Sequence, residues 1–254
     1  MIKGVIAFLI IAVLIPGLFV VAKVTFPPKQ SGVGPGPTDS AGEKKPAENN
    51  SSKPAPQYKV ITGPKLMPVD EASKNDSFAR FRTELNTAVK NKDIGFLKQH
   101  IDEKIKYSFG DNSGIDGFIR EWKLDKDPQN SQLWVELEKV ITLGGAFDTR
   151  GAFVAPYVFA KFPESVDAFV YAAVIDKNVK LYANPDDKSQ VVGLLNYNIV
   201  KTAEFRKDRP WQKVSAENLE GYVETKYIRS PIDYRAYLEE KDGVWKMVFF
   251  VAGD

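Results

Sequence analysis

The sequence contains no cysteine and a single histidine, His100, in 254 residues. The absence of cysteine excludes disulfide bonds, thiolate nucleophiles and cysteine-ligated zinc or iron–sulfur sites. One histidine is too few for a histidine-rich metal site, and no nucleophile pattern surrounds it. We expect His100 to be solvated or to cap the end of a helix, and we expect no cofactor and no metal.

An excess of either charge is also missing, because 35 Lys and Arg residues are balanced by 33 Asp and Glu residues for a net charge of +2. Nucleic-acid-binding domains carry a clearly basic face, so no nucleic-acid partner is expected. The nearest approach to a carboxylate cluster is formed by Asp111, Asp116 and Glu121. Their spacing lacks the regular oxygen-ligand pattern of a calcium-binding loop, and we expect no catalytic residues.

One long apolar run is present, at residues 4–22. Its 19 residues are close to the roughly 20 that cross a bilayer as a helix. Lys3 and Lys23 frame the run as an uncleaved anchor, whereas Ala22 is a possible end of a cleaved signal peptide. We expect residues 1–26 to be a transmembrane anchor or a signal peptide. Either way the body lies on the non-cytoplasmic side of a bacterial envelope, as a single-pass membrane protein or, after cleavage, as an exported one.

Residues 27–64 are rich in Pro, Gly, Ser, Asn and Lys and show no apolar period before Tyr58. Such a composition buries too little apolar surface to offset the entropy lost on ordering. We expect this stretch to be a disordered linker that tethers the body to the membrane.

Residues 65–165 predict an α+β domain. Helical spacing of apolar residues predicts helices over residues 73–90, 115–124 and 131–143. The first helix has Asp76 or Ser77 as its expected N-cap. Its expected buried face consists of Phe78, Phe81, Leu85, Ala88 and Val89.

Three shorter elements complete this region in the sequence. Asp93 is placed to cap a short helix, and alternating apolar residues predict a strand over residues 103–109. Residues 147–162 are rich in Phe and Val and are expected to be extended, with Pro156 marking an edge or a bend.

Residues 166–230 show short apolar segments separated by turns, which predicts a small β-barrel or sandwich. The expected strands are residues 178–182, 190–195, 199–205, 211–214 and 221–224. Residues 231–254 then form a predicted hairpin around Asp242 and Gly243. Two strands alone are marginally stable. We therefore expect this hairpin to return to the helical part and complete the domain that begins at residue 65.

Four short motifs occur in order within residues 166–230: NVKLYANP from Asn178, SQVVGLL from Ser189, PWQKV from Pro210 and GYVETKYI from Gly221. Together they resemble the bacterial SH3-like (Src-homology-3-like) domain over about residues 174–229. The resemblance implies a compact barrel that contacts peptidoglycan, peptides or partner proteins. Leu181 and Tyr182 stand where the family commonly has arginine.

The resemblance implies a ligand-binding surface made of aromatic side chains. The candidate residues are Tyr182, Trp211, Tyr222 and Tyr227. Tyr222 replaces the tryptophan that is usual in the family. The flanking segments are loosely similar to nuclear-transport-factor-2-like α+β folds, which can enclose a pocket.

Three functions follow from these observations. The first is a membrane-tethered, non-catalytic binding or scaffolding protein of the envelope that contacts the cell wall or partner proteins. The second is a small-molecule sensor or carrier with a pocket in the α+β domain. The third is a cell-wall hydrolase, for which the residue content leaves a carboxylate-only glycosidase.

Overall fold

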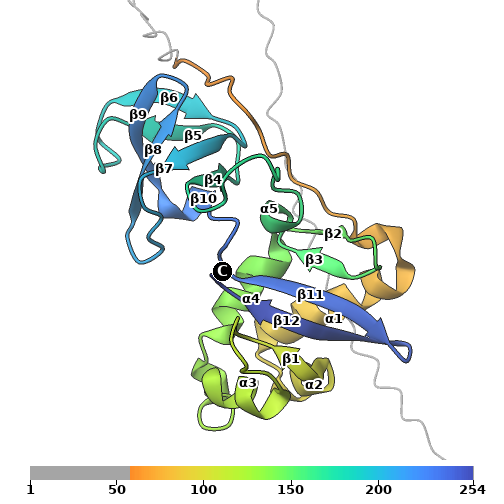
Figure 1. Cartoon of the computed structure of the whole chain (residues 1–254). Helices are drawn as coiled ribbons and strands as arrows, with labels where there is room; N and C mark the ends of the chain where they lie inside the picture. Colours follow the sequence, from red (N-terminus) through yellow and green to blue (C-terminus); the bar gives the residue numbers. More distant parts are fainter. Residues whose placement is uncertain (1–57, 254) are drawn as a thin grey trace, which may run out of the picture. The chain divides into compact units, whose positions relative to one another are not determined.

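The computed structural model describes residues 58–253. The chain separates into two compact units, residues 1–53 and 54–254, and the fold described is that of the second unit (Figure 1). The predicted membrane segment at residues 1–26 lies outside the described residues, as does the predicted linker before residue 58. Within residues 58–253, no helix is long and apolar enough to cross a membrane. The expected mixed α+β class is confirmed, because the described residues form two β-sheets and a set of α-helices that precede most of the strands in the sequence.

The first sheet has five strands in the order β1-β12-β11-β3-β2. Its strands are β1 (Ile101–Lys106), β2 (Ala146–Phe147), β3 (Phe153–Ala155), β11 (Arg235–Lys241) and β12 (Val244–Val251). β1 runs parallel to β12, and the other pairs are antiparallel. The C-terminal hairpin therefore lies at the centre of a sheet whose outer strands come from much earlier in the sequence. This pairing agrees with the expected return of the hairpin, whereas the domain boundaries themselves stay predictions.

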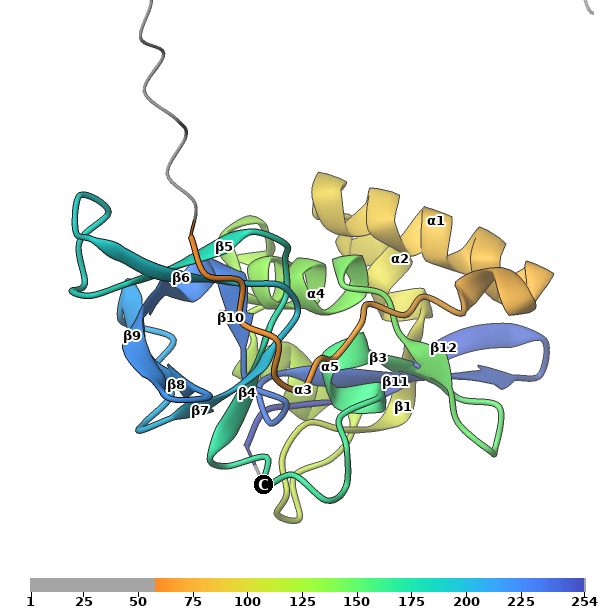
Figure 2. The same ribbon diagram turned by 90° about the horizontal axis from the view of Figure 1, so that it is seen from above.

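Helices pack against this sheet and against each other. They are α1 (Asp76–Asn91), α2 (Ile94–Gln99), α3 (Ile115–Glu121), α4 (Leu133–Thr142) and α5 (Tyr157–Ala160), with 3-10 turns η1 (Ala72–Lys74) and η2 (Pro128–Asn130). Figure 2 shows α1, α2 and α4 on the same side of the β11–β12 hairpin. α4 ends before Gly144, whose positive φ of 70° suits a residue without a side chain.

The buried face of α1 is the one that its apolar spacing predicts: Phe78, Phe81, Leu85, Ala88 and Val89. Its N-cap is Asn75 rather than the expected Asp76 or Ser77, because Asn75 is extended and its side chain accepts the N–H of Phe78 at 3.0 Å. Asp93 caps α2 as predicted, by accepting the N–H of Phe96 at 3.0 Å.

Aromatic rings fill the core between α1 and the five-stranded sheet. Phe78 is fully buried, and its ring centroid lies 4.2 Å from that of Phe153 and 4.8 Å from that of Trp245. Such pairs add roughly 0.5–1.5 kcal/mol to the contribution of buried area. His100 is the C-cap of α2, as expected, and its ring stacks on Phe96 at 4.2 Å between centroids.

Two extended segments differ from the prediction. The strand expected at residues 103–109 lies at Ile101–Lys106, because Ile101 and Ile105 face the core, whereas Phe109 is 51% exposed. The segment 147–162 is not one extended stretch, because a turn joins the antiparallel strands β2 and β3 and the extended part ends at Ala155. Pro156 then begins the short helix α5, which buries two residues that the extended prediction missed, Tyr157 and Val158.

The second sheet has seven antiparallel strands in the order β10-β4-β7-β8-β9-β5-β6. They are β4 (Tyr171–Val174), β5 (Val179–Tyr182), β6 (Val191–Leu195), β7 (Ile199–Thr202), β8 (Trp211–Ala216), β9 (Leu219–Glu224) and β10 (Ile228–Arg229), with a 3-10 turn η3 (Thr225–Tyr227). Aliphatic side chains make up its buried core: Ile61, Ala172, Val174, Val179, Leu181, Leu195, Val200, Val214, Ala216, Val223 and Ile228.

Residues 58–66, which we call the strap, run along this second sheet toward the helical part (Figure 1). Ile61 is fully buried, and its N–H donates to the carbonyl oxygen of Leu194 at 2.9 Å. Glu217 accepts hydrogen bonds from the N–H groups of Thr62 and Gly63, both at 3.0 Å. The linker predicted to end at residue 64 is therefore too long at this end, because Ile61 belongs to the core of the second sheet.

Candidate functional site

A hollow of about 600 Å³ lies on the outer face of the seven-stranded sheet. Side chains alternate between the two faces of a strand, so in β8 Gln212 and Val214 point inward while Trp211 and Lys213 point outward. The residues around the hollow are Pro185, Ala203, Glu204, Arg209, Pro210, Trp211, Gln212, Lys213 and Tyr222. Two aromatic rings and two prolines thus form a concave apolar surface with charges at its rim.

Two of the four predicted binding residues, Trp211 and Tyr222, line this hollow, and a third, Tyr182, packs against Trp211. Tyr222 in β9 lies opposite Tyr182 in β5 and opposite Lys213 in β8. The rings of Tyr182 and Trp211 meet edge to face, with centroids 5.4 Å apart at 85°. Tyr182 is only 6% exposed, so it buttresses the Trp211 ring through this contact, and Trp211 and Tyr222 line the hollow.

A glycine makes this arrangement possible. Gly221 precedes Tyr222 in β9, and a Cβ atom at this position would lie 2.6 Å from the carbonyl oxygen of Tyr182 and 2.8 Å from Cγ of Leu181. Any larger residue would push β5 away from β9. Gly221 therefore sets the distance between the strands that carry the aromatic residues.

The loop between β7 and β8 forms one wall of the hollow and is fixed by a buried amide. Gln212 is 2% exposed, and its side chain accepts the N–H of Arg206 at 3.0 Å and donates to the hydroxyl of Thr225 at 2.8 Å. The Thr225 hydroxyl in turn donates to the carbonyl oxygen of Arg209 at 2.6 Å. Buried polar groups that are fully paired specify one conformation, so Pro210 and Arg209 are held in place beside Trp211.

Charged side chains of both signs, Glu204, Arg209 and Lys213, line the hollow, and further charged residues pair with their neighbours. Arg206 pairs with Asp208 at 3.1 Å and with Glu204 at 3.3 Å, and its hydrogen bond lowers the pKa of the Asp208 carboxyl. Lys213 pairs with Glu220 across β8 and β9 at 3.2 Å. Exposed pairs of this kind contribute little to stability. They present donors and acceptors of both signs around the aromatic rings.

The remaining sequence candidates lie elsewhere. Tyr227 sits in η3, where it packs against the aliphatic core and has the Lys226 ammonium 4.8 Å from its ring centroid. Asp111, Asp116 and Glu121 are exposed. Within residues 58–253, no group of His, Asp or Glu residues is arranged to hold a metal ion.

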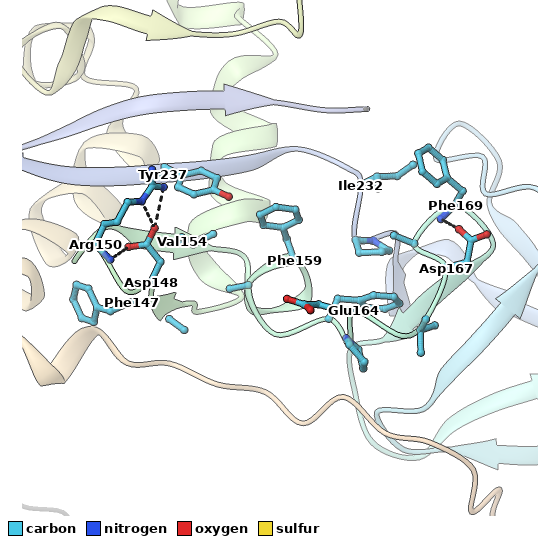
Figure 3. Close-up of a pocket in the computed structure, with 17 residues that line it drawn as sticks. Phe147, Asp148, Arg150, Val154, Phe159, Glu164, Asp167, Phe169, Ile232 and Tyr237 are labelled. Atoms are coloured by element: carbon cyan, nitrogen blue, oxygen red, sulfur yellow. Dashed lines mark hydrogen bonds and ion pairs between the residues drawn. The ribbon is translucent and has the colours of Figure 1, made fainter.

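A second hollow, also of about 600 Å³, lies beside β3 and β11 (Figure 3). Its aromatic side chains are Phe147, Phe159, Phe162, Phe169 and Tyr237. In Figure 3, Asp148 and Arg150 stand at one end, Asp167 and Phe169 at the other, and Glu164 between them. Three acidic residues against one arginine give its lining a formal charge of −2.

Local electrostatics in this second hollow favour an ionised Asp148. Burial opposes ionisation, but the N–H groups of Arg150 and Ala152 and the Arg150 guanidinium outweigh it and hold the pKa of the carboxyl below its usual value. Burial raises the pKa of the Tyr237 phenol, which stays protonated at neutral pH.

The hollow on the seven-stranded sheet includes several residues that the sequence analysis does not propose as binding residues. Arg209 and Pro210 come from the loop before β8, and Pro185 comes from the turn after β5. Their place beside Trp211 depends on the pairing of β5 with β9, which no local pattern reveals.

Compared with family models, with curated proteins and with solved structures, the chain has no significant match.

Proposed function

We propose that this protein is a membrane-tethered, non-catalytic binding or scaffolding protein of the envelope. In this proposal residues 1–26 are the membrane anchor and the seven-stranded module is an SH3-like domain that contacts the cell wall. The observation that supports this proposal is the hollow on the outer face of the sheet, which Trp211 and Tyr222 line while Tyr182 packs against the Trp211 ring.

The chemistry of the hollow suits recognition of an extended polymer. Aromatic rings supply rigid contact area with little loss of conformational entropy. The charges of Arg209, Glu204 and Lys213 supply hydrogen-bonding groups of both signs around them. Peptidoglycan offers both partners, because it combines sugar rings with short peptides that carry amino and carboxyl groups.

The test is retention of the full chain, in detergent, on purified peptidoglycan. Truncating a central aromatic contact residue costs about 2 kcal/mol or more of binding free energy, which is about thirtyfold in affinity. We expect Tyr222→Ala to reduce retention by that order. A matched control is Phe169→Ala, which removes an aromatic ring that is 63% exposed and lies outside this hollow.

The outcomes separate clearly. Retention of the unchanged chain that Tyr222→Ala abolishes and Phe169→Ala preserves supports the proposal. Failure of the unchanged chain to bind peptidoglycan contradicts contact with the cell wall. A protein is then the remaining partner for a scaffolding function. Equal loss in both variants contradicts the assignment of the hollow.

A second candidate function is a small-molecule carrier or sensor, favoured by the ring of aromatic side chains in the hollow of Figure 3. Its formal charge of −2 suits an aromatic cation, because cations are attracted both to carboxylates and to ring faces. Under this function benzylamine raises the melting temperature of the full chain, and Phe159→Ala removes the effect while Tyr222→Ala preserves it.

A further inference from the structure

A third cavity, of about 800 Å³, lies between the loop preceding β8, the segment from η3 to β10 and the C-terminal end of α4. Its apolar lining consists of Leu143, Ile175, Phe205, Pro210 and Ile228. Five basic side chains also line it: Lys139, Lys207, Arg209, Lys226 and Arg229. With Asp208, Glu224 and Asp233 as the acidic lining, the formal charge of the cavity wall is +2.

Arg229 is the unusual member of this set. It is only 6% exposed, and arginine is rarely buried unless its charge is paired. Its Nη2 donates to the carbonyl oxygen of Tyr234 at 2.6 Å, and its Nη1 lies 3.6 Å from the Asp233 carboxylate. Its Nε has no hydrogen-bond partner among the described residues.

Two carboxylates, Asp233 and Glu136, act on the charge of Arg229, but neither completes its pairing with a hydrogen bond among the described residues. Asp233 also accepts the N–H of Tyr234 at 2.8 Å and lies 3.5 Å from the Lys207 ammonium. An arginine fork binds a carboxylate or a phosphate best through two parallel hydrogen bonds, and the 3.6 Å contact is too long for one of them. Burial accordingly lowers the pKa of Arg229.

Arg229 lines the cavity, and its guanidinium offers more N–H donors than its hydrogen bond to Tyr234 uses. The volume of about 800 Å³ leaves room beside it for a small molecule. The positive wall selects an anion, and the apolar side chains opposite it select a ligand with a hydrophobic body.

We propose that this cavity binds a small amphipathic oxyanion, a carboxylate or phosphate group attached to an apolar moiety. Arg229 binds the anionic group, Leu143, Ile175 and Phe205 contact the apolar part, and Lys207 lies at the mouth. Lys207 is suited to this role because it is half exposed and its two ion pairs, with Glu136 and Asp233, are long at 3.8 and 3.5 Å.

The test is isothermal titration of the full chain, in detergent, with phenyl phosphate, inorganic phosphate and benzyl alcohol. Phenyl phosphate carries both the anion and the apolar body, whereas the other two probes carry one each. We expect phenyl phosphate to bind at least about tenfold more tightly than either, because a charge-assisted hydrogen bond is worth about 1.5–3 kcal/mol. Arg229→Lys keeps the charge but loses the fork, and we expect about a tenfold loss.

A second variant covers the possibility that Arg229→Lys fails to fold. Lys207→Gln is matched by Lys213→Gln, because the two side chains are 51% and 52% exposed and each is ion-paired with a carboxylate, Lys207 with Glu136 and Asp233 and Lys213 with Glu220. We expect Lys207→Gln to weaken phenyl phosphate binding about threefold, the effect of one exposed charge, and Lys213→Gln to leave it unchanged. Equal binding of all three probes, no saturable binding at millimolar concentrations, or equal effects of the two lysine variants overturns the proposal. None of these results depends on peptidoglycan retention.

Discussion

The two sheets of the body place their aromatic residues in opposite locations. Around the five-stranded sheet, aromatic rings are the core: Phe78, Phe118, Trp134, Phe153, Trp245 and Phe250 are all at most 5% exposed. The buried core of the seven-stranded sheet is aliphatic, with Phe205 and Tyr227 packed against its edge, and Trp211 and Tyr222 are partly exposed around a hollow.

This difference indicates that aromatic residues serve core packing in the five-stranded region and are available for ligand binding on the seven-stranded sheet. Large rings bury 150–250 Å² each and stabilise a core efficiently, so their exclusion from the centre of the seven-stranded module leaves its stability to Val, Ala, Leu and Ile. Rings that are not needed for packing and stand beside a concave surface are available to a ligand. Removing a ring should therefore affect stability in the first region and binding in the second.

The largest expected effect is on Phe78. Its ring contacts those of Phe81, Phe147, Phe153 and Trp245, and Phe78→Ala should lower the free energy of unfolding by about 3–5 kcal/mol. Denaturant titration of the full chain measures this loss. Phe169→Ala is the control, with an expected change within about 0.5 kcal/mol; a loss below about 1 kcal/mol for Phe78→Ala would contradict the aromatic core.

The next effect concerns the strap. Ile61→Ala removes a fully buried side chain from the aliphatic core and should lower the free energy of unfolding by about 2–4 kcal/mol. Val60 is 49% exposed, so Val60→Ala should change stability by less than about 0.5 kcal/mol. If the two variants behave alike in denaturant titration, the strap is not part of this core.

A smaller effect is expected for Trp211. Because its ring is partly exposed, Trp211→Ala should lower the free energy of unfolding by about 1–2 kcal/mol, less than the 3–5 kcal/mol of a buried ring. Trp245→Ala, at a site only 5% exposed, provides the contrast. Thermal or chemical unfolding measures the free energy of unfolding of both variants. Equal losses in Trp211→Ala and Trp245→Ala would contradict the distinction between the two regions.

The smallest effect depends on pH. Hydrogen bonds from Thr62 and Gly63 lower the pKa of Glu217 below its usual value of 4.5. A carboxyl whose pKa is lower in the folded state stabilises the fold above its unfolded pKa, and this contribution is lost as the pH falls through the folded pKa. Stability should therefore fall below about pH 4.5, and Glu217→Gln should show less of this decline. Glu220→Gln, elsewhere in the same hairpin, should retain it; identical pH profiles for all three proteins would refute the role of Glu217.

The sequence predicts the helical half of the fold well. The apolar spacing of α1 identifies its five buried residues, and Asp93 is recognisable as an N-cap because both signals are local. The strap and β4 were missed for the opposite reason. Ile61 and the small residues Ala172 and Ala173 show no period of their own, and they are buried only because distant strands pair around them.

The candidate site was predicted in the same uneven way. Trp211, Tyr222 and Tyr182 were named from short motifs, and the structure brings them together, whereas Tyr227 lies apart in η3. The loop residues Arg209 and Pro210 join them through the buried side chain of Gln212. A glutamine in an alternating strand carries no sequence signal that its amide will fix a neighbouring loop.

The four tryptophans of the chain allow the most direct test of this account. Their indole N–H signals can be followed by NMR in the full chain as soluble peptidoglycan fragments are added, and Trp211→Phe identifies the signal of Trp211. The account predicts that the Trp211 signal shifts in a saturable way while those of Trp134 and Trp245, buried in the five-stranded region, stay in place. Movement of the buried tryptophan signals without that of Trp211 would contradict it, and so would the absence of any shift.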